Sequence, residues 1–141
     1  MLMGLSALGV AISGYLTWVR YSGTPALCTS AGGCAQVQTS RYADIAGVPV
    51  AALGLALYLL LLGLSLWQAR AGPTVPPAVP LALFGLALAG TLFSAYLTYL
   101  EVFVIRALCP WCVGSAVVVT AILALAVANL GMPEVDAHAP E

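Results

Sequence analysis

The residues best suited to chemistry are four cysteines, which fall into two close pairs: Cys28 with Cys34, and Cys109 with Cys112. The second pair forms a Cys-x-x-Cys segment directly before an apolar run. Two thiols at this spacing can close a small disulfide ring. A helix that begins there turns its positive N-terminal end toward the second sulfur, which favours the thiolate. Because thiolates are the nucleophiles of thiol–disulfide exchange, the segment predicts a redox-active dithiol.

The composition indicates that these thiols belong to an integral membrane protein. The chain has 141 residues, of which 62% are hydrophobic and only 6% are charged. A soluble domain has about 25% charged residues, so this chain lacks the side chains to form a polar surface. Its length suits one domain. With only four basic side chains the chain has no basic patch, which argues against nucleic acid binding.

Four apolar runs are long enough to cross the hydrocarbon core of a membrane, which is about 30 Å thick, as helices rising about 1.5 Å per residue. We expect an all-α four-helix bundle over residues 1–131, with spans at about 2–19, 48–67, 81–100 and 113–130. Prolines at positions 73, 76, 77 and 80 should prevent the second helix from continuing through the polar link of residues 68–80. Residues 132–141 are expected to form a disordered tail.

The long connection between the first two spans carries the first cysteine pair. Two glycines, Gly32 and Gly33, precede Cys34 and indicate a turn. A weak apolar pattern over Cys34–Ala46 favours a short helix that lies on the membrane surface. Four spans place both termini on one side and both cysteine pairs on the other. The two pairs are therefore expected to exchange electrons directly.

Two arguments disagree about the orientation in the membrane. The cysteine side carries Arg20, Arg41 and Arg106, whereas the opposite side carries only Arg70. By the positive-inside rule, this bias would put the cysteines in the cytoplasm. Thiol pairs used for disulfide chemistry belong instead in an oxidising compartment. We follow the redox argument and place the cysteine pairs on the extracytoplasmic side, with both termini in the cytoplasm.

Three roles for the four cysteines compete. They could form structural disulfides in a non-enzymatic four-helix scaffold. They could bind one zinc ion, although the five residues between Cys28 and Cys34 exceed the usual ligand spacing of about two to four. They could also form a disulfide relay, in which a loop pair exchanges with a fixed pair. The relay needs an electron acceptor, and the chain has neither a dinucleotide nor a haem-attachment motif. A lipid-soluble quinone among the helices is the acceptor that best suits this architecture.

Around these cysteines the chain resembles the vitamin K epoxide reductase family, over about residues 5–130. The matching positions in the first half are Cys28, Gly33, Cys34, Val37, Ser40, Arg41, Tyr42, Gly47, Val48, Pro49, Gly54 and Tyr58. Those in the second half are Glu101, Cys109, Pro110, Trp111, Cys112 and Ser115. Two cysteine pairs, with a serine six residues after the second loop cysteine, make this pattern more specific than an isolated Cys-x-x-Cys.

The resemblance implies a four-helix bundle around a quinone, either ubiquinone or menaquinone, in a bacterial cytoplasmic membrane. It also implies that electrons from a thioredoxin-like, DsbA-like protein enter at Cys28 and Cys34, pass to Cys109 and Cys112, and reduce the quinone. This would support disulfide bond formation. Because the sequence ends at residue 141, the partner is expected to be a separate protein. In this scheme Cys112 lies next to the quinone, Cys109 exchanges with the loop, and Ser40 supports the loop.

Further residues receive weaker assignments. Trp111 is a second candidate for quinone contact, although an interface anchor is the preferred role. Glu101 either relays protons to the quinone or, as we prefer, is solvated at the membrane boundary. Tyr58 is expected to be a packing residue. Ala116 occupies a position where epoxide-reducing animal members have tyrosine, which favours plain quinone reduction.

One alternative enzyme family does the same work. The DsbB-type quinone-linked oxidases are also four-helix membrane proteins, but their Cys-x-x-Cys lies in the first outer loop and their wider pair in the second. The order is reversed here, which favours the vitamin K epoxide reductase family.

Overall fold

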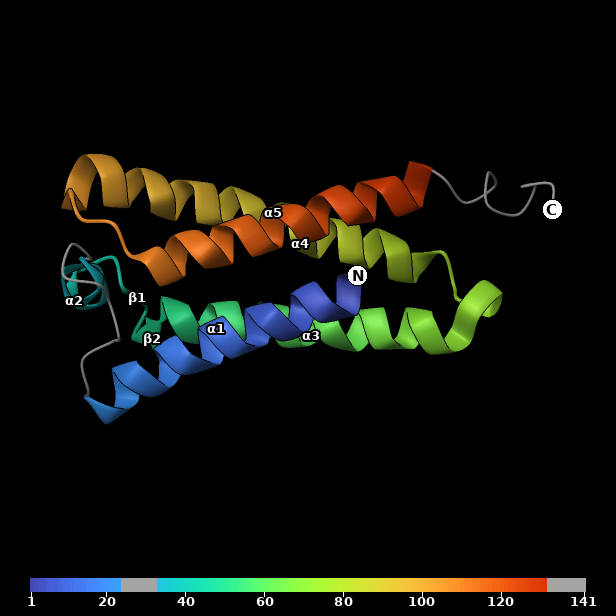
Figure 1. Cartoon of the computed structure of the whole chain (residues 1–141), viewed down its shortest axis with the longest axis horizontal. Coiled ribbons are helices and arrows are strands. Elements are labelled where there is room, and N and C mark those ends of the chain that lie inside the picture. The colour runs from blue at the N-terminus through green and yellow to red at the C-terminus, as the bar shows by residue number, and fades with distance from the viewer. Residues whose placement is uncertain (24–32, 132–141) are drawn as a thin grey trace.

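Four long helices form the protein in a computed structural model that describes residues 1–23 and 33–131 (Figure 1). They are α1 (Leu2–Ser22), α3 (Val50–Ala71), α4 (Ala78–Tyr99) and α5 (Pro110–Gly131). All four are long and apolar enough to cross a membrane. A helix satisfies its own backbone hydrogen bonds, which is why an apolar run without water adopts it. The expected all-α membrane fold is confirmed. Cys28 and the expected tail of residues 132–141 lie outside the described residues.

The helix ends follow the local sequence, with one departure from expectation. α1 ends at Gly23, which adopts the left-handed conformation (φ 71°) and donates its N–H to the Val19 carbonyl at 3.2 Å. A 3₁₀ turn, η1 (Gly72–Thr74), follows α3. α4 begins at Ala78, slightly before the expected start of the third span at about residue 81. Pro80 then lies in the first helical turn, where a missing N–H costs no helical hydrogen bond.

Between α1 and α3 the chain forms a short helix and a hairpin. The helix α2 spans Cys34–Thr39, and strands β1 (Asp44–Ile45) and β2 (Val48–Pro49) pair antiparallel. The expected helix over Cys34–Ala46 is therefore too long. The chain becomes extended at Ser40 (ψ 157°), and the hairpin turn has positive φ at both Ala46 (52°) and Gly47 (84°). This is the backbone of a tight two-residue hairpin turn, which the weak apolar pattern did not indicate.

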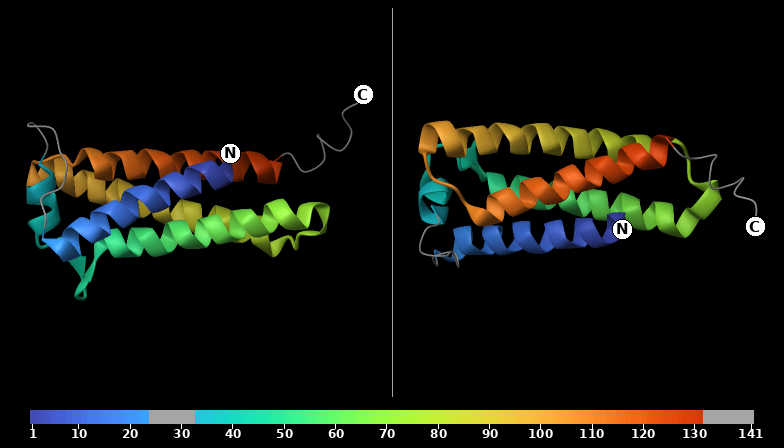
Figure 2. Two further views of the ribbon diagram at one scale, coloured as in Figure 1. Left: turned by 60° about the horizontal axis from the view of Figure 1, so that its bottom comes forward. Right: turned by 45° about the horizontal axis from the view of Figure 1, so that its top comes forward.

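The helices pack so that α1 lies against α3 and α5, and α4 lies against α5 and α3. Figure 2 shows α2 and the hairpin gathered at one end of the bundle, together with the connection between α4 and α5. The centre of the bundle is the side chain of Tyr58, which is 1% exposed and packs against Gly9 of α1. The other buried residues around it are Ile12, Leu16, Leu61, Val79, Leu83, Ala87, Val118, Val119 and Ile122.

Gly9 is the position where the packing of α1 on α3 leaves the least room. A Cβ added there would overlap the Tyr58 ring. We predict that Gly9→Ala lowers the free energy of unfolding by about 1–3 kcal/mol, because either the ring or the whole helix must move. Equilibrium unfolding in mixed detergent micelles measures this change. Gly14→Ala is the control, since its added Cβ would meet only Leu55 at an ordinary 3.9 Å. Equal stability of the two variants would contradict the prediction.

Candidate functional site

The connection between α4 and α5 holds the Cys-x-x-Cys segment in a defined turn. α4 continues into a π-helical turn, η2 (Leu100–Ile105), and the chain then reverses at Arg106 in the left-handed conformation (φ 56°). Cys109 lies at the start of α5, where its carbonyl accepts a hydrogen bond from the Val113 N–H at 3.0 Å. Pro110 takes the first helical position, which needs no N–H donor. Cys109 thus lies at the positive end of α5.

Glu101 holds this turn from inside the bundle. Its carboxylate oxygen Oε2 accepts a hydrogen bond from the Cys109 N–H at 3.1 Å, and its backbone carbonyl accepts one from the Ala107 N–H at 3.0 Å. The residue is only 3% exposed. The expectation that Glu101 is solvated at the membrane boundary is therefore wrong. A carboxylate that is buried this way needs such hydrogen bonds to offset the cost of losing water.

The two thiols of the segment are unequal. Cys109 is fully buried, Cys112 is partly buried, and both are free thiols in the described part of the chain. A hydrogen bond from the Cys112 thiol lowers the pKa of the Cys109 thiol, although burial opposes this shift. We expected the helix to favour the thiolate of the second sulfur, but the thiol with the lowered pKa is the first. The single S–H of Cys112 has a second possible acceptor in the Glu101 carboxyl group.

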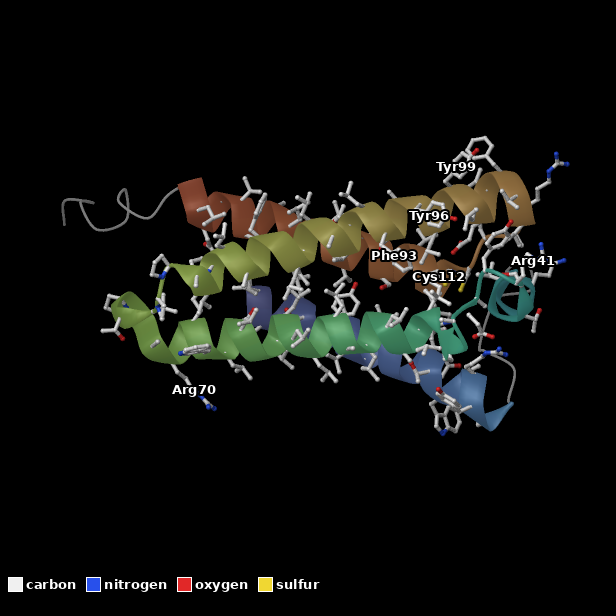
Figure 3. All side chains as sticks on the ribbon, turned by 180° about the vertical axis from the view of Figure 1, so that it is seen from behind. Arg41, Arg70, Phe93, Tyr96, Tyr99 and Cys112 are labelled. Atoms are coloured by element: carbon white, nitrogen blue, oxygen red, sulfur yellow. The ribbon has the colours of Figure 1, made fainter. Side chains whose placement is uncertain are left out.

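A largely apolar cavity of about 160 Å³ opens beside Cys112. Figure 3 shows Cys112 facing the interior of the bundle near α2, whereas Tyr99 lies on the outer surface. Helices α1, α3, α4 and α5 form its walls, and the α2–hairpin segment covers one end. The lining residues are Ser13, Leu16, Val37, Ser40, Tyr42, Ala43, Pro49, Val50, Ala51, Leu53, Gly54, Leu57, Tyr58, Gly90, Phe93, Ser94, Leu97, Thr98, Leu100, Glu101, Ile105, Cys112, Ser115 and Val119.

The size and chemistry of this cavity suit a single planar ring. A protein cavity of about 150 Å³ with apolar walls is large enough to bind benzene. The lining also includes polar side chains, among them Glu101, Cys112 and Ser115. The cavity can therefore hold an apolar ring with polar substituents, such as a quinone head group, next to the Cys112 sulfur.

Of the first cysteine pair, the structure describes the backbone of Cys34, which is the first residue of α2. The preceding residue, Gly33, donates its N–H to the carbonyl of Leu108 at 2.9 Å. Gly33 also lies so close to Ala107 that a Cβ at position 33 would overlap the Ala107 methyl group. These contacts connect the start of α2 to the residue before Cys109. Cys28, the other loop cysteine, lies outside the described residues.

Three further residues, Arg20, Asp44 and Ser40, hold the loop in place at this end of the bundle. The Arg20 guanidinium, at the end of α1, donates to the Asp44 carboxylate of β1 at 2.6 Å. Both side chains are about one third exposed (34% and 39%), so this ion pair positions the hairpin more than it stabilises the fold. Ser40 caps α2 by donating its Oγ–H to the Val37 carbonyl at 2.8 Å, and it lines the cavity.

Trp111 does not line the cavity. Its ring packs against Tyr15 of α1 with a centroid separation of 5.0 Å, and it contacts the buried core. This geometry fits the anchoring role better than quinone contact.

Tyr58 does more than the packing expected of it, because its hydroxyl also forms hydrogen bonds. Its hydroxyl donates to the Ser115 carbonyl at 2.7 Å and lies 3.0 Å from the Ser115 Oγ. A buried tyrosine needs such a partner, but no sequence signal connects positions 57 residues apart.

The unequal thiols lead to a prediction in a variant without the loop cysteines (Cys28→Ala, Cys34→Ala). In this background Cys109 should titrate below the range of an ordinary cysteine, so it should be a thiolate at lower pH. Adding Cys112→Ala removes the S–H donor and should raise the pKa of Cys109, so that a higher pH is needed. The 13C chemical shift of labelled cysteine Cβ, followed against pH, measures both. Cys112→Ser keeps a donor and should restore part of the effect. An unchanged titration in Cys112→Ala would contradict the assignment.

Comparisons with known proteins identify the family of the chain. The family model described as "Vitamin K epoxide reductase family" matches residues 1–127. The thiol-disulfide oxidoreductase LTO1 of Arabidopsis thaliana is 31% identical over 130 residues, which cover 86% of this chain. The chain spans about a third (34%) of that relative's length. Because the match covers α1, α3, α4, most of α5 and the turn with its two thiols, the chain belongs to the vitamin K epoxide reductase family.

Proposed function

We propose that the protein is a membrane thiol oxidoreductase that passes electrons from a thioredoxin-like dithiol protein through two cysteine pairs to a quinone. One juxtaposition carries this proposal. The Cys109–Cys112 dithiol lies between the docking point of the cysteine loop and an apolar cavity large enough for one ring. The name of the plant relative, a thiol-disulfide oxidoreductase, supports the same class of reaction.

The reaction is a series of two disulfide exchanges followed by one oxidation. A dithiol partner reduces the Cys28–Cys34 disulfide, and its own two sulfurs form a disulfide. The resulting loop dithiol then attacks the Cys109–Cys112 disulfide through a mixed disulfide. Each exchange breaks one S–S bond and forms one, so two electrons and two protons move with each step. The Cys109–Cys112 pair, called the fixed pair below, is left as a dithiol that must be oxidised again.

Cys109 suits the exchange with the loop. It adjoins Leu108, whose carbonyl binds Gly33 of the loop, and α5 places a positive helix end beside it. A lowered pKa makes a thiol a better leaving group, so Cys109 is released readily from a mixed disulfide.

Cys112 suits the contact with the acceptor because, of the pair Cys109 and Cys112, it is the one that lines the cavity. A bound quinone supplies the final acceptor of two electrons and two protons. The ring would lie among the apolar side chains of α3 and α4, with Ser115 and Tyr58 as the nearby hydroxyl-bearing residues.

The proposed orientation puts the cysteine end of the bundle on the extracytoplasmic side. A thiol pair that oxidises other proteins is useful in a compartment where disulfides persist. The described arginines of this end, Arg20, Arg41 and Arg106, oppose this orientation by the positive-inside rule. Asp44 forms an ion pair with Arg20 at 2.6 Å and so neutralises its charge. Two unneutralised arginines, Arg41 and Arg106, then remain at this end, compared with Arg70 at the other end.

Quinone reduction by purified protein tests the proposal. With dithiothreitol as donor, the wild type should reduce a soluble quinone, and Cys112→Ala should lose this activity because no disulfide can form in the fixed pair. The absorbance change of the quinone measures turnover. Cys28→Ala with Cys34→Ala should keep dithiothreitol-driven turnover but lose turnover driven by a thioredoxin-like protein. Thr120→Ala, an exposed α5 residue that bonds only within its own helix, is the control. Undiminished partner-driven turnover without the loop cysteines would reject the relay.

The docking of the loop on the reactive turn gives a second prediction. Gly33→Val should force the start of α2 away from Ala107 and break the hydrogen bond from residue 33 to Leu108. One such bond contributes about 1–1.5 kcal/mol, so partner-driven turnover should fall roughly tenfold. Dithiothreitol-driven turnover should stay unchanged, since a small dithiol does not need the loop.

The matched control is Gly63→Val in α3, where an added Cβ has no neighbour within 4 Å. If Gly33→Val lowered both turnovers by the same factor, the variant would be damaging the fixed pair, and the docking role would be rejected.

A further inference from the structure

The carboxyl group of Glu101 lies between the Cys109–Cys112 pair and the cavity. It is the second possible acceptor of the Cys112 S–H and accepts the N–H of Cys109 at 3.1 Å. The same residue lines the cavity and is only 3% exposed. A single buried carboxyl group therefore touches both members of the dithiol and the space intended for the acceptor.

Among the described residues that line the cavity, Glu101 is the only carboxylate, and the other titratable groups are Tyr42, Tyr58 and Cys112. The Tyr58 hydroxyl already donates its proton to the Ser115 carbonyl at 2.7 Å. Tyr42 is 36% exposed and belongs to the loop segment that covers the cavity. Proton transfer from Cys112 to Tyr58 would disturb the hydrogen bond between Tyr58 and Ser115. Transfer to Glu101 leaves that bond intact, so Glu101 is the better proton acceptor.

An ionisable residue in a membrane-spanning segment is costly and usually marks a pathway for protons or substrates. Holding the turn does not need an ionisable group. An amide oxygen, as in glutamine, would accept the Cys109 N–H equally well. A carboxylate at this position does one thing that an amide cannot do: it accepts a proton.

We infer that Glu101 is a catalytic residue, the proton acceptor for the Cys112 thiol and the proton donor to the reduced quinone. This inference rests on the proposed function and assigns the route of one proton within it.

The step balances as follows. Glu101 takes the proton of the Cys112 S–H. The S–S bond between Cys109 and Cys112 forms, and the electron pair that is lost from the two sulfurs reduces the quinone. Glu101 then gives its proton to one quinone oxygen. The proton lost earlier from Cys109 to water returns from the aqueous face to the other oxygen. One dithiol is oxidised, one quinone is reduced, and the Glu101 carboxylate is regenerated.

The test separates the two halves of the cycle in Glu101→Gln, which keeps the hydrogen-bond acceptor for Cys109 but cannot carry a proton. Oxidation of the prereduced protein by a soluble quinone should slow roughly a hundredfold, the lower end for the loss of a general base. Reduction of the Cys109–Cys112 disulfide by dithiothreitol should change little. Stopped-flow absorbance of the quinone and of a thiol reagent measures the two halves. Glu101→Asp, which keeps the acid, should be oxidised faster than Glu101→Gln.

A second measurement does not depend on any variant. Oxidation of the wild-type dithiol should be slower in heavy water than in ordinary water, because a thiol proton moves in that step. Equal rates in the two solvents would overturn the inference. So would Glu101→Gln if quinone oxidised it as fast as the wild type, or if both halves slowed equally. A wild type that quinone does not oxidise would instead reject the proposed function itself.

Discussion

The hydrogen bond from the Cys109 N–H to the Glu101 carboxylate is the contact on which the reactive end of the bundle depends. It connects the π-helical turn η2 to the residue directly before α5, across a reversal at Arg106, a non-glycine residue with positive φ. Left-handed backbone costs a residue such as Arg106 roughly 1–2 kcal/mol, so this turn needs contacts that hold it. Glu101 accepts three backbone hydrogen bonds from this turn. Its carboxylate accepts the Cys109 N–H, and its backbone carbonyl accepts the N–H groups of Arg106 and Ala107.

This arrangement gives one buried residue two effects on the dithiol. It fixes the backbone of Cys109 at the start of α5, where the helix favours a thiolate, and its negative charge raises the proton affinity of the same sulfur. The hydrogen bond from Cys112 outweighs that repulsion, so the pKa of Cys109 is lowered. The two sulfurs therefore differ because of their contacts, although they belong to one short segment. That difference suits a pair in which one sulfur faces a protein loop and the other faces a cavity.

The cysteine loop serves the site in two places at once. At Gly33 it lies against Ala107 with no room for a side chain, which brings the backbone of Cys34 beside the reactive turn. Further along, Val37, Ser40 and the hairpin cover the end of the cavity. The ion pair of Arg20 with Asp44 connects this cover to α1. Loop docking and the cover of the cavity thus come from one continuous segment, with the docking contact at Gly33 and the cover from Val37 onward.

The sequence alone determined the class of fold, because 62% hydrophobic residues in four long runs leave a helical membrane bundle as the stable solution. It also identified the two cysteine pairs as the residues to which the proposed function assigns the chemistry. Counting the spans predicted that α2, which begins at Cys34, lies at the same end of the bundle as Cys109 and Cys112. These inferences needed only local composition and spacing.

Tertiary structure decided everything that depends on contacts between distant positions. Glu101 lies at a membrane boundary by position, yet the π-helical turn directs it inward to Cys109, eight residues away. Tyr58 meets Ser115 across 57 residues, and the hairpin at Ala46–Gly47 replaces an expected helix because the backbone there has positive φ. The cavity itself comes from five separate segments. Hydropathy and spacing report which residues leave water, but only packing decides which of them meet.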